Sequence, residues 1–349
     1  MSNATKTLQK PAWDAKRVGN LLLNNALFIL MGIAIVYIAI KNPRFIQPAS
    51  IINILSQTAA YLPAALGIGG CIVLTGTDLS AGRIVGLTAC ISASLLQNAA
   101  NVANKMWPQI GTLPIWVVIP AAMVIGAAFG AFNGFFVAKF KLHPFIVTLG
   151  TQLIVYTLLL LYVQMGNNNG MAISNLDKSY TDFVKGELFN VGGTAVPRYV
   201  LFAVILAVLM WFIWNKTTFG KNMFAVGSNE EAARVSGVNV TMVIIGVFAL
   251  AGVTYGYTGF IEAARMGAST GTIGLNYELD AIAACVIGGV SFVGGIGKIS
   301  GVVLGVVLMQ LIMSGMTFLG ISGNTTYIIK GLVILIACAI DMRKYLTKK

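Results

Sequence analysis

The chain of 349 residues has little charge and few of the side chains that carry out chemistry in enzymes. Only 10% of its residues are Asp, Glu, Lys or Arg, and it has a single histidine. Soluble domains carry roughly 25% charged residues, so this composition excludes an ordinary soluble protein. The residues are instead 57% hydrophobic, with a mean hydropathy of +0.83. The chain is therefore predicted to be an integral membrane protein.

Cysteine and histidine are too few, and too scattered, for a metal site or a disulfide framework. No CxxC pair occurs, and the lone His143 precedes a proline, where we interpret it as a helix-boundary residue. All four cysteines lie in apolar segments, as small buried residues would. They are Cys71, Cys90, Cys285 and Cys338.

Nucleotide-binding and catalytic motifs are also missing. The run Gly-Gly-Ile-Gly-Lys-Ile-Ser at 294–300 superficially resembles a phosphate-binding loop. A Walker A loop needs glycine five residues before its Gly-Lys pair and Ser or Thr after it, where this chain has Phe292 and Ile299. We interpret these glycines as permitting a tight turn. The chain is predicted not to be an enzyme, with no catalytic, metal or cofactor-binding residues.

Ten apolar runs predict an all-α, polytopic fold in a single transmembrane domain covering 1–349. A membrane span needs about 20 apolar residues, and two of the runs are short or interrupted. The first run has no evident cleavage site, so we interpret it as an uncleaved span. The runs lie near 21–40, 51–74, 82–99, 113–138, 144–165, 198–214, 241–264, 281–293, 299–319 and 326–341.

Lysine and arginine predict the orientation, because they are enriched on the cytoplasmic side. With ten crossings, the tails 1–20 and 342–349 and the polar segment 215–240 share one side, and 15 of the 23 basic residues fall there. That side is predicted to be cytoplasmic. The polar segment 166–197 is then periplasmic, either touching a partner or serving as an inert connector. The basic residues assigned to the cytoplasmic side are Lys6, Lys10, Lys16, Arg17, Arg83, Lys139, Lys141, Lys216, Lys221, Arg234, Lys298, Arg343, Lys344, Lys348 and Lys349.

The segment 215–240 contains a short helix with marked ends. Ser228 followed by Glu231 fits a capping box, and Gly237 stands where a left-handed residue would end the helix. Ala232 and Ala233 leave one flank small enough for another protein to approach. We interpret the segment as a docking element; an interfacial connector is the alternative. The predicted docking residues are Ser228, Asn229, Glu230, Glu231, Ala232, Ala233, Arg234 and Gly237.

Two acidic segments each follow a long span. Asp78 lies in Thr-Gly-Thr-Asp-Leu-Ser-Ala-Gly at 75–82, and Asp280 lies in Glu-Leu-Asp-Ala-Ile-Ala-Ala at 278–284. On the predicted topology they lie on opposite sides of the membrane, which suggests an inverted repeat of spans two to five and seven to ten. For each aspartate alone, a helix N-cap is the alternative interpretation. The candidate residues of a translocation path or helix break are Asp78, Ser80, Glu278 and Asp280.

Glycines recur at every fourth position in three runs, which is typical of closely packed membrane helices. They are Gly126, Gly130 and Gly134, then Gly252 and Gly256, then Gly301 and Gly305.

Five motifs together resemble the permeases of bacterial sugar ABC importers. They are Gly-Thr-Asp-Leu-Ser-Ala-Gly at 76–82, Pro-Phe-Ile-Val-Thr-Leu-Gly at 144–150, Phe-Gly-Lys at 219–221, Ala-Val-Gly-Ser-Asn-Glu-Glu-Ala-Ala-Arg-Val-Ser-Gly at 225–237, and Tyr-Glu-Leu-Asp-Ala-Ile-Ala-Ala-Cys at 277–285. The resemblance covers nearly the whole chain. It is closest to the galactose/methyl-galactoside type, because ribose-type relatives more often have Ile-Asp-Leu-Ser-Val-Gly in the first motif.

The resemblance implies a homodimeric permease of the bacterial inner membrane. The implied partners are an ATPase with two fused nucleotide-binding domains, which binds ATP and Mg, and a periplasmic sugar-binding protein; nucleic acid is not expected. In that family the loop matching 230–237 is the coupling helix that seats in the ATPase. Specificity lies largely with the binding protein, so no tight sugar site is expected in this chain.

Three functions therefore stand side by side. The first is import of a monosaccharide driven by ATP, with galactose, methyl-galactoside or glucose ahead of another sugar such as ribose. The second is secondary transport driven by an ion gradient, favoured by the inverted repeat and disfavoured by a lack of carboxylates inside the membrane. The third is a receptor or scaffold, favoured by the docking loop and disfavoured by glycine-rich, broken helices.

Overall fold

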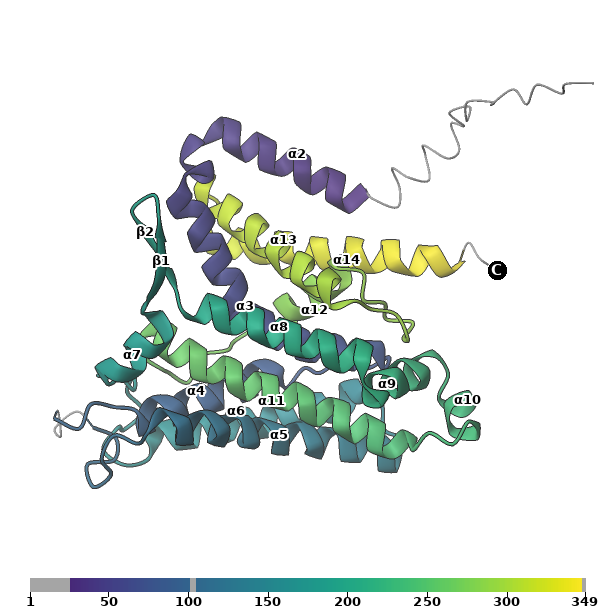
Figure 1. The fold of residues 1–349 in the computed structure, drawn as a ribbon, viewed down its shortest axis with the longest axis horizontal. Coiled ribbons are helices and arrows are strands. Elements are labelled where there is room, and N and C mark those ends of the chain that lie inside the picture. Colours follow the sequence, from purple (N-terminus) through teal and green to yellow (C-terminus); the bar gives the residue numbers. More distant parts are fainter. Residues whose placement is uncertain (1–25, 101–104, 347–349) are drawn as a thin grey trace, which may run out of the picture.

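The computed structural model describes residues 26–100 and 105–346, and its helices confirm the predicted all-α, polytopic fold (Figure 1). The first tail, 1–20, and the last three residues lie outside the described residues. The elements are α2 (Ala26–Lys41), η1 (Pro43–Ile46), α3 (Pro48–Val73), α4 (Ala81–Leu95), α5 (Ile115–Phe140), α6 (Pro144–Gln164), α7 (Lys178–Lys185), β1 (Glu187–Val191), β2 (Thr194–Pro197), α8 (Tyr199–Lys216), α9 (Thr218–Ser228), α10 (Glu230–Val235), α11 (Val240–Met266), α12 (Tyr277–Ile287), α13 (Ile299–Phe318) and α14 (Gly323–Leu346).

Each of the ten apolar runs contains a helix, but not every one of these helices is long enough to cross the membrane. Among the described residues, six helices are long and apolar enough to cross a membrane: α3, α5, α6, α8, α11 and α13. At 11 residues, α12 is about 16 Å long, which is about half of a hydrocarbon core of roughly 30 Å. The run at 281–293 therefore forms only a partial crossing.

Loops gather at two ends of the bundle (Figure 1). At the left of Figure 1 lie α7 and the antiparallel pair β1–β2, which form the segment 166–197 together with its turns. At the right lie α9 and α10, and the described start of α2 and the end of α14 lie at this same end. We call these the hairpin end and the α10 end.

Two interrupted segments enter the bundle from these opposite ends. The segment 74–80 follows α3 at the α10 end, where the amide of Gly295 donates a 2.8 Å hydrogen bond to the carbonyl oxygen of Val73. The segment 267–276 follows α11 at the hairpin end, where Ser269 pairs with Ile173. Opposite entry is what an inverted repeat requires.

The two segments then meet inside the bundle, at the starts of α4 and α12. A Cβ atom added to Gly82 would collide with Oε2 of Glu278 and with the carbonyl oxygen of Gly274. The prediction that Asp78 and Asp280 lie on opposite sides of the membrane is therefore wrong. Non-helical backbone carries both segments into the interior, so both aspartates lie near the meeting point rather than at the two surfaces.

The glycines at every fourth position pack helices together within this chain, as predicted. Backbone of α5 and α11 comes so close that a Cβ on Gly126 would meet the carbonyl oxygen of Gly252, and the reverse also holds. Gly305 lies in the same way against Ala284 of α12. Such backbone contact lets helices associate without large side chains between them.

Candidate functional site

A buried polar network fixes the first interrupted segment. Oδ1 of Asp78 accepts hydrogen bonds from the amide (3.0 Å) and hydroxyl (2.6 Å) of Ser80. Nδ2 of Asn133, on α5, donates to Oγ of Ser80 at 2.9 Å, and Oγ1 of Thr151, on α6, donates to Oδ1 of Asn133 at 2.6 Å. Irregular backbone within a membrane needs such internal partners. The N-cap position of α4 is Ser80, so the interpretation of Asp78 as an N-cap is wrong.

Carboxylates do lie inside the bundle, contrary to the sequence-based expectation. Asp78 is fully buried and Glu278 is 5% exposed. Among the described residues, neither Oδ2 of Asp78 nor Oε2 of Glu278 has a hydrogen-bond partner. Arg83 is also internal, with its guanidinium 4.3 Å from the ring centroid of Tyr156 on α6, so its assignment to a cytoplasmic connection is wrong. Its position in the sequence, next to Gly82, did not indicate that its side chain lies inside the bundle.

An ion pair joins α12 to α14. Nζ of Lys330 lies 2.8 Å from each carboxylate oxygen of Asp280, and the two side chains are only 15% and 12% exposed. Asp280 is inside the first turn of α12, so the N-cap interpretation fails for it too. Its partner is 50 residues further along the chain. Lys330 is not among the basic residues predicted to be cytoplasmic, and no sequence pattern predicted the pair.

This ion pair lines a cleft of about 390 Å³ between α3, α12, α13 and α14. The ring of Tyr61, which also lines it, stacks on Tyr277 at a centroid distance of 4.2 Å and an interplanar angle of 16°. The remaining wall combines the polar side chains of Asn53, Gln57, Gln310, Ser314 and Thr317 with the apolar side chains of Ile54, Met313 and Phe318. The sequence pattern does not reveal this cluster, because its members come from four helices that are distant along the chain.

The cleft occupies the half of the bundle nearer the hairpin end. Its α3 residues lie in the first half of that helix, whose first residue, Pro48, faces Gly192 between the two strands. Its α13 residues lie at the end of that helix, where Asn42 donates a hydrogen bond to the carbonyl oxygen of Phe318. The cleft therefore reaches from near the hairpin end to the start of α12.

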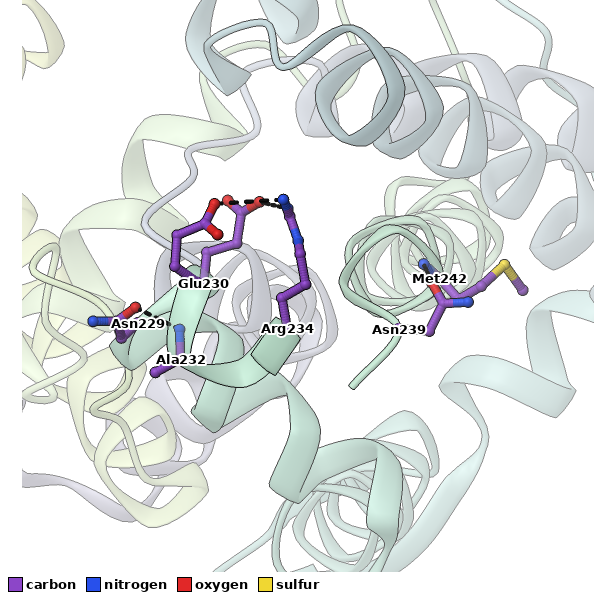
Figure 2. A network of polar contacts seen from close by, with 7 residues as sticks. Asn229, Glu230, Ala232, Arg234, Asn239 and Met242 are labelled. Atoms are coloured by element: carbon purple, nitrogen blue, oxygen red, sulfur yellow. Dashed lines mark hydrogen bonds and ion pairs between the residues drawn. The ribbon is translucent and has the colours of Figure 1, made fainter. Parts of the chain in front are cut away.

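At the α10 end, the predicted short helix is present but begins one residue later than the capping box required. Asn229 is its N-cap, and Oδ1 of Asn229 accepts a 2.9 Å hydrogen bond from the amide of Ala232 (Figure 2). Ser228 is instead the last residue of α9, and its hydroxyl donates to the carbonyl oxygen of Phe224 at 2.8 Å. The capping box of Ser228 and Glu231 is therefore wrong. Asn is as effective an N-cap as Ser.

Charge and backbone geometry at the other end of α10 agree with the prediction. Arg234 pairs with Glu230 at 2.6 Å and with Glu231 at 3.4 Å, as Figure 2 shows for the first pair. Gly237 has a φ of +84°. The amides of Gly237 and Val238 bond to the carbonyl oxygens of Arg234 and Ala233, which is a Schellman motif.

The exposed face of α10 is not the one expected. Ala233 is 4% exposed and belongs to the core of its own chain, so it is not available to a partner. Ala232 is exposed, as are both glutamates. Val235 is 89% exposed, and sequence reasoning left it out. The sequence feature that could have indicated it is a single valine among the charged residues and alanines of this helix.

Contacts connect α9 to the end of α3, directly before the interrupted segment 74–80, and to the turn at 294–295. A Cβ on Gly227, near the end of α9, would collide with the carbonyl oxygen of Val73. Gly294 and Gly295 have φ values of +89° and +68° and lie against Gly227 and Ser228. The Walker-like run is thus a tight turn, as interpreted. It borders a second cavity, of about 590 Å³, between α9 and the start of α13.

These features together define a class of protein. Apolar helices cross the bundle, two shortened helices begin in its interior beside buried carboxylates, and a polar helix projects at one end. Discontinuous helices of this kind are found in membrane transporters. The chain has the architecture of a multi-pass membrane transport protein.

Comparison with known proteins gives the particular family. Residues 50–338 match the family described as branched-chain amino acid transport system / permease component, and the chain belongs to this family. It is 44% identical over 338 residues to the galactose/methyl galactoside import permease protein of Haemophilus influenzae, covering 97% of this chain and 99% of that protein. It is also 44% identical over 329 residues to the Escherichia coli protein of that name, covering 94% and 96%.

A more distant relative is the ribose import permease protein of Bacillus subtilis, which is 34% identical over 317 residues and covers 91% of this chain and 92% of that protein. No solved structure matches the chain. The chain is thus a permease component of a transport system, as the five motifs predicted, and the three relatives named here cover 91–97% of it.

Proposed function

We propose that the chain is the permease subunit of an ATP-driven importer of galactose or methyl-galactoside in the bacterial inner membrane. The observation that carries the proposal is the identity of 44% to galactose/methyl galactoside permeases over nearly the full length of both chains, against 33–34% for ribose permeases. The family description names amino acids, but these relatives are named for sugars. The polar cleft also suits a hydroxylated substrate better than an aliphatic side chain.

The permease works with partners in this proposal. A single domain, 1–349, pairs with a second copy, a periplasmic sugar-binding protein and an ATPase with two fused nucleotide-binding domains. ATP and Mg are bound by the ATPase, and this chain contributes no catalytic group. The coupling helix is α10 with its flanks. Its docking residues are Ser228, Asn229, Glu230, Glu231, Ala232 and Arg234, while the buried Ala233 and the left-handed Gly237 shape the helix without reaching the partner.

The proposed orientation follows from that docking. The α10 end, with the described start of α2 and the end of α14, faces the cytoplasm, where ATP is available. The hairpin end faces the periplasm and receives the binding protein. The four basic residues of 1–20 agree with this orientation.

Uptake by proteoliposomes tests the proposal. The permease is reconstituted with the ATPase and the binding protein, and uptake of labelled galactose, ribose and leucine is compared. We expect galactose uptake that requires ATP and the binding protein. Uptake driven by an ion gradient without ATP would favour a secondary transporter, for which the internal carboxylates Asp78 and Glu278 give a structural reason. Uptake of ribose or leucine, but not galactose, would show that the proposed substrate is wrong while leaving the proposed ATP-driven mechanism intact.

A further inference from the structure

We propose that the cleft between α3, α12, α13 and α14 is a low-affinity binding site for a neutral monosaccharide on its way through the membrane. The ion pair of Asp280 and Lys330 is the centre of its hydrogen bonding, and the ring of Tyr61 forms one wall. The inference rests on the proposed function, since it takes import of a sugar as given. It adds the place and the residues at which this chain itself contacts the sugar.

The ion pair has unused hydrogen-bonding capacity. Charges inside a membrane protein are costly and usually mark a functional site, and pairing Asp280 with Lys330 offsets part of that cost. A carboxylate offers about four lone-pair sites and an ammonium group three donors. Nζ of Lys330 contacts both carboxylate oxygens, and the lone pairs and N–H groups that this contact does not use are free to accept from, and donate to, sugar hydroxyl groups. Because the pair is neutral as a whole, it favours a neutral polyol over an anion or a cation.

Unpartnered amides surround the pair. Within the described residues, the side-chain amides of Asn53, Gln57 and Gln310 line the cleft and make no hydrogen bond to protein. Gln310 is the most informative of them, because it is only 6% exposed. Its amide lines the cleft without a partner among the described residues, so it is free to hydrogen-bond with a molecule that enters the cleft.

Size and shape suit a monosaccharide. Pockets for small molecules have volumes of roughly 300–1,000 Å³, and this cleft has about 390 Å³. The aromatic wall of Tyr61, held flat by its stacking on Tyr277, offers a rigid apolar face for the C–H side of a sugar ring. The polar amides stand on α3 and α13, around the same space. The arrangement combines one apolar face with convergent hydrogen-bonding groups.

Binding here is weak by necessity. A substrate that is to leave on the far side must be held loosely at each site on its route. The expectation that this chain holds no tight sugar site therefore stays a prediction, now with a dissociation constant in the millimolar range.

Cysteine protection tests occupancy directly in the reconstituted three-component transporter. Ser314→Cys is made with Cys338→Ser, since the other three native cysteines are buried, and is labelled with a small neutral methanethiosulfonate. About 100 mM D-galactose, which saturates a millimolar site, should slow labelling by about threefold or more. Glycine betaine at equal osmolarity should not. Asn190→Cys, exposed on β1, is the matched control and should be unaffected by either.

A second pair of variants tests whether the site is used in transport. Gln310→Leu should lower galactose uptake by about two- to tenfold and change the ratio of uptake between galactose and its deoxy analogues. A purely structural role would leave that ratio unchanged. Gln152→Leu, on α6 and away from the cleft, is the matched control and should behave as wild type in both measurements.

The outcomes separate the two proposals. If wild-type proteoliposomes import galactose, while Ser314→Cys is not protected and Gln310→Leu transports like Gln152→Leu, the cleft is not on the route and only this inference is overturned. If the wild type imports no monosaccharide, the proposed function itself fails. Protection at Ser314→Cys together with a changed uptake ratio for Gln310→Leu supports both.

Discussion

The amide of Gly295 donates a 2.8 Å hydrogen bond to the carbonyl oxygen of Val73, and this bond joins the turn at 294–295 to the end of a helix more than 200 residues earlier in the sequence. Val73 is the last residue of α3, directly before the interrupted segment 74–80. Gly227 of α9 presses against the same carbonyl group. The helix α9, which leads into the proposed docking helix α10, thus contacts the residue before an interrupted segment directly, so a displacement of α9 would reach the interior without passing through a flexible linker.

The contact at Gly227 predicts an uncoupled variant. In Gly227→Ala, the new Cβ collides with backbone of α3, which must shift at a cost of about 1–3 kcal/mol. We expect normal capture of the ATPase but sugar-stimulated ATP hydrolysis reduced by about tenfold. Gly150→Ala on α6, where a Cβ meets nothing within 4 Å, is the matched control. Equal hydrolysis in the two variants would contradict direct coupling through this contact.

Topology gives a second prediction. Met171→Cys, 71% exposed near the hairpin end, should react with an impermeant thiol reagent added outside intact spheroplasts. Ala232→Cys, exposed on α10, should react only after the membrane is opened. Met171 is preferred to its neighbour Gly170, whose φ of +80° a cysteine would strain. Reaction of both cysteines from outside would refute the orientation.

Gly237 gives a third prediction, which concerns backbone geometry alone. An added Cβ meets nothing within 4 Å, and φ is +84°. Substitutions at this position are therefore expected to differ only in how much strain the positive φ places on the new residue. Gly237→Val should destabilise the end of α10 by about 1–3 kcal/mol and weaken capture of the ATPase. Gly237→Asn should be close to wild type, because Asn tolerates the left-handed region. Similar losses in both variants would mean that the glycine is needed for space at the partner surface.

The sequence predicted what depends on local pattern. The helices follow from apolar runs of sufficient length, and the left-handed Gly237 follows from its place after a short helix. The N-cap was wrong by one residue because Ser228 and Asn229 are both good caps, and only the end of α9 decides between them. The sequence therefore predicted that α10 exists, but the residue at which α10 begins depends on where α9 ends.

Tertiary relationships were outside the reach of pattern. A period of 3.6 residues places Ala232 and Ala233 about 100° apart on a helix, but it does not say which of them faces the chain's own core. The pairing of Asp280 with Lys330, and the meeting of Glu278 with Gly82, depend on how α12 and α14 lie against the rest of the bundle. Local sequence patterns do not specify how these helices pack against one another, so they did not predict the cleft.

Val235 gives the last prediction, and it tests the docking role of α10. The side chain is 89% exposed, so a change there should leave the fold and thermal stability of the permease unchanged. Apolar side chains that become buried at the centre of an interface often dominate its binding energy. Val235→Asp should therefore weaken capture of the ATPase by about tenfold or more and reduce transport in proportion.

Val235→Leu is the matched control, since it keeps an apolar side chain of similar size and should keep both capture and transport. The measurement is the affinity of the detergent-solubilised permease for the ATPase, alongside thermal unfolding of the same samples. If Val235→Asp is as stable as wild type and binds the ATPase equally well, this face of α10 does not dock. The glutamates beside it would not sustain docking alone, because an exposed salt bridge contributes only about 0–1 kcal/mol. The helix would then be a connector between α9 and α11.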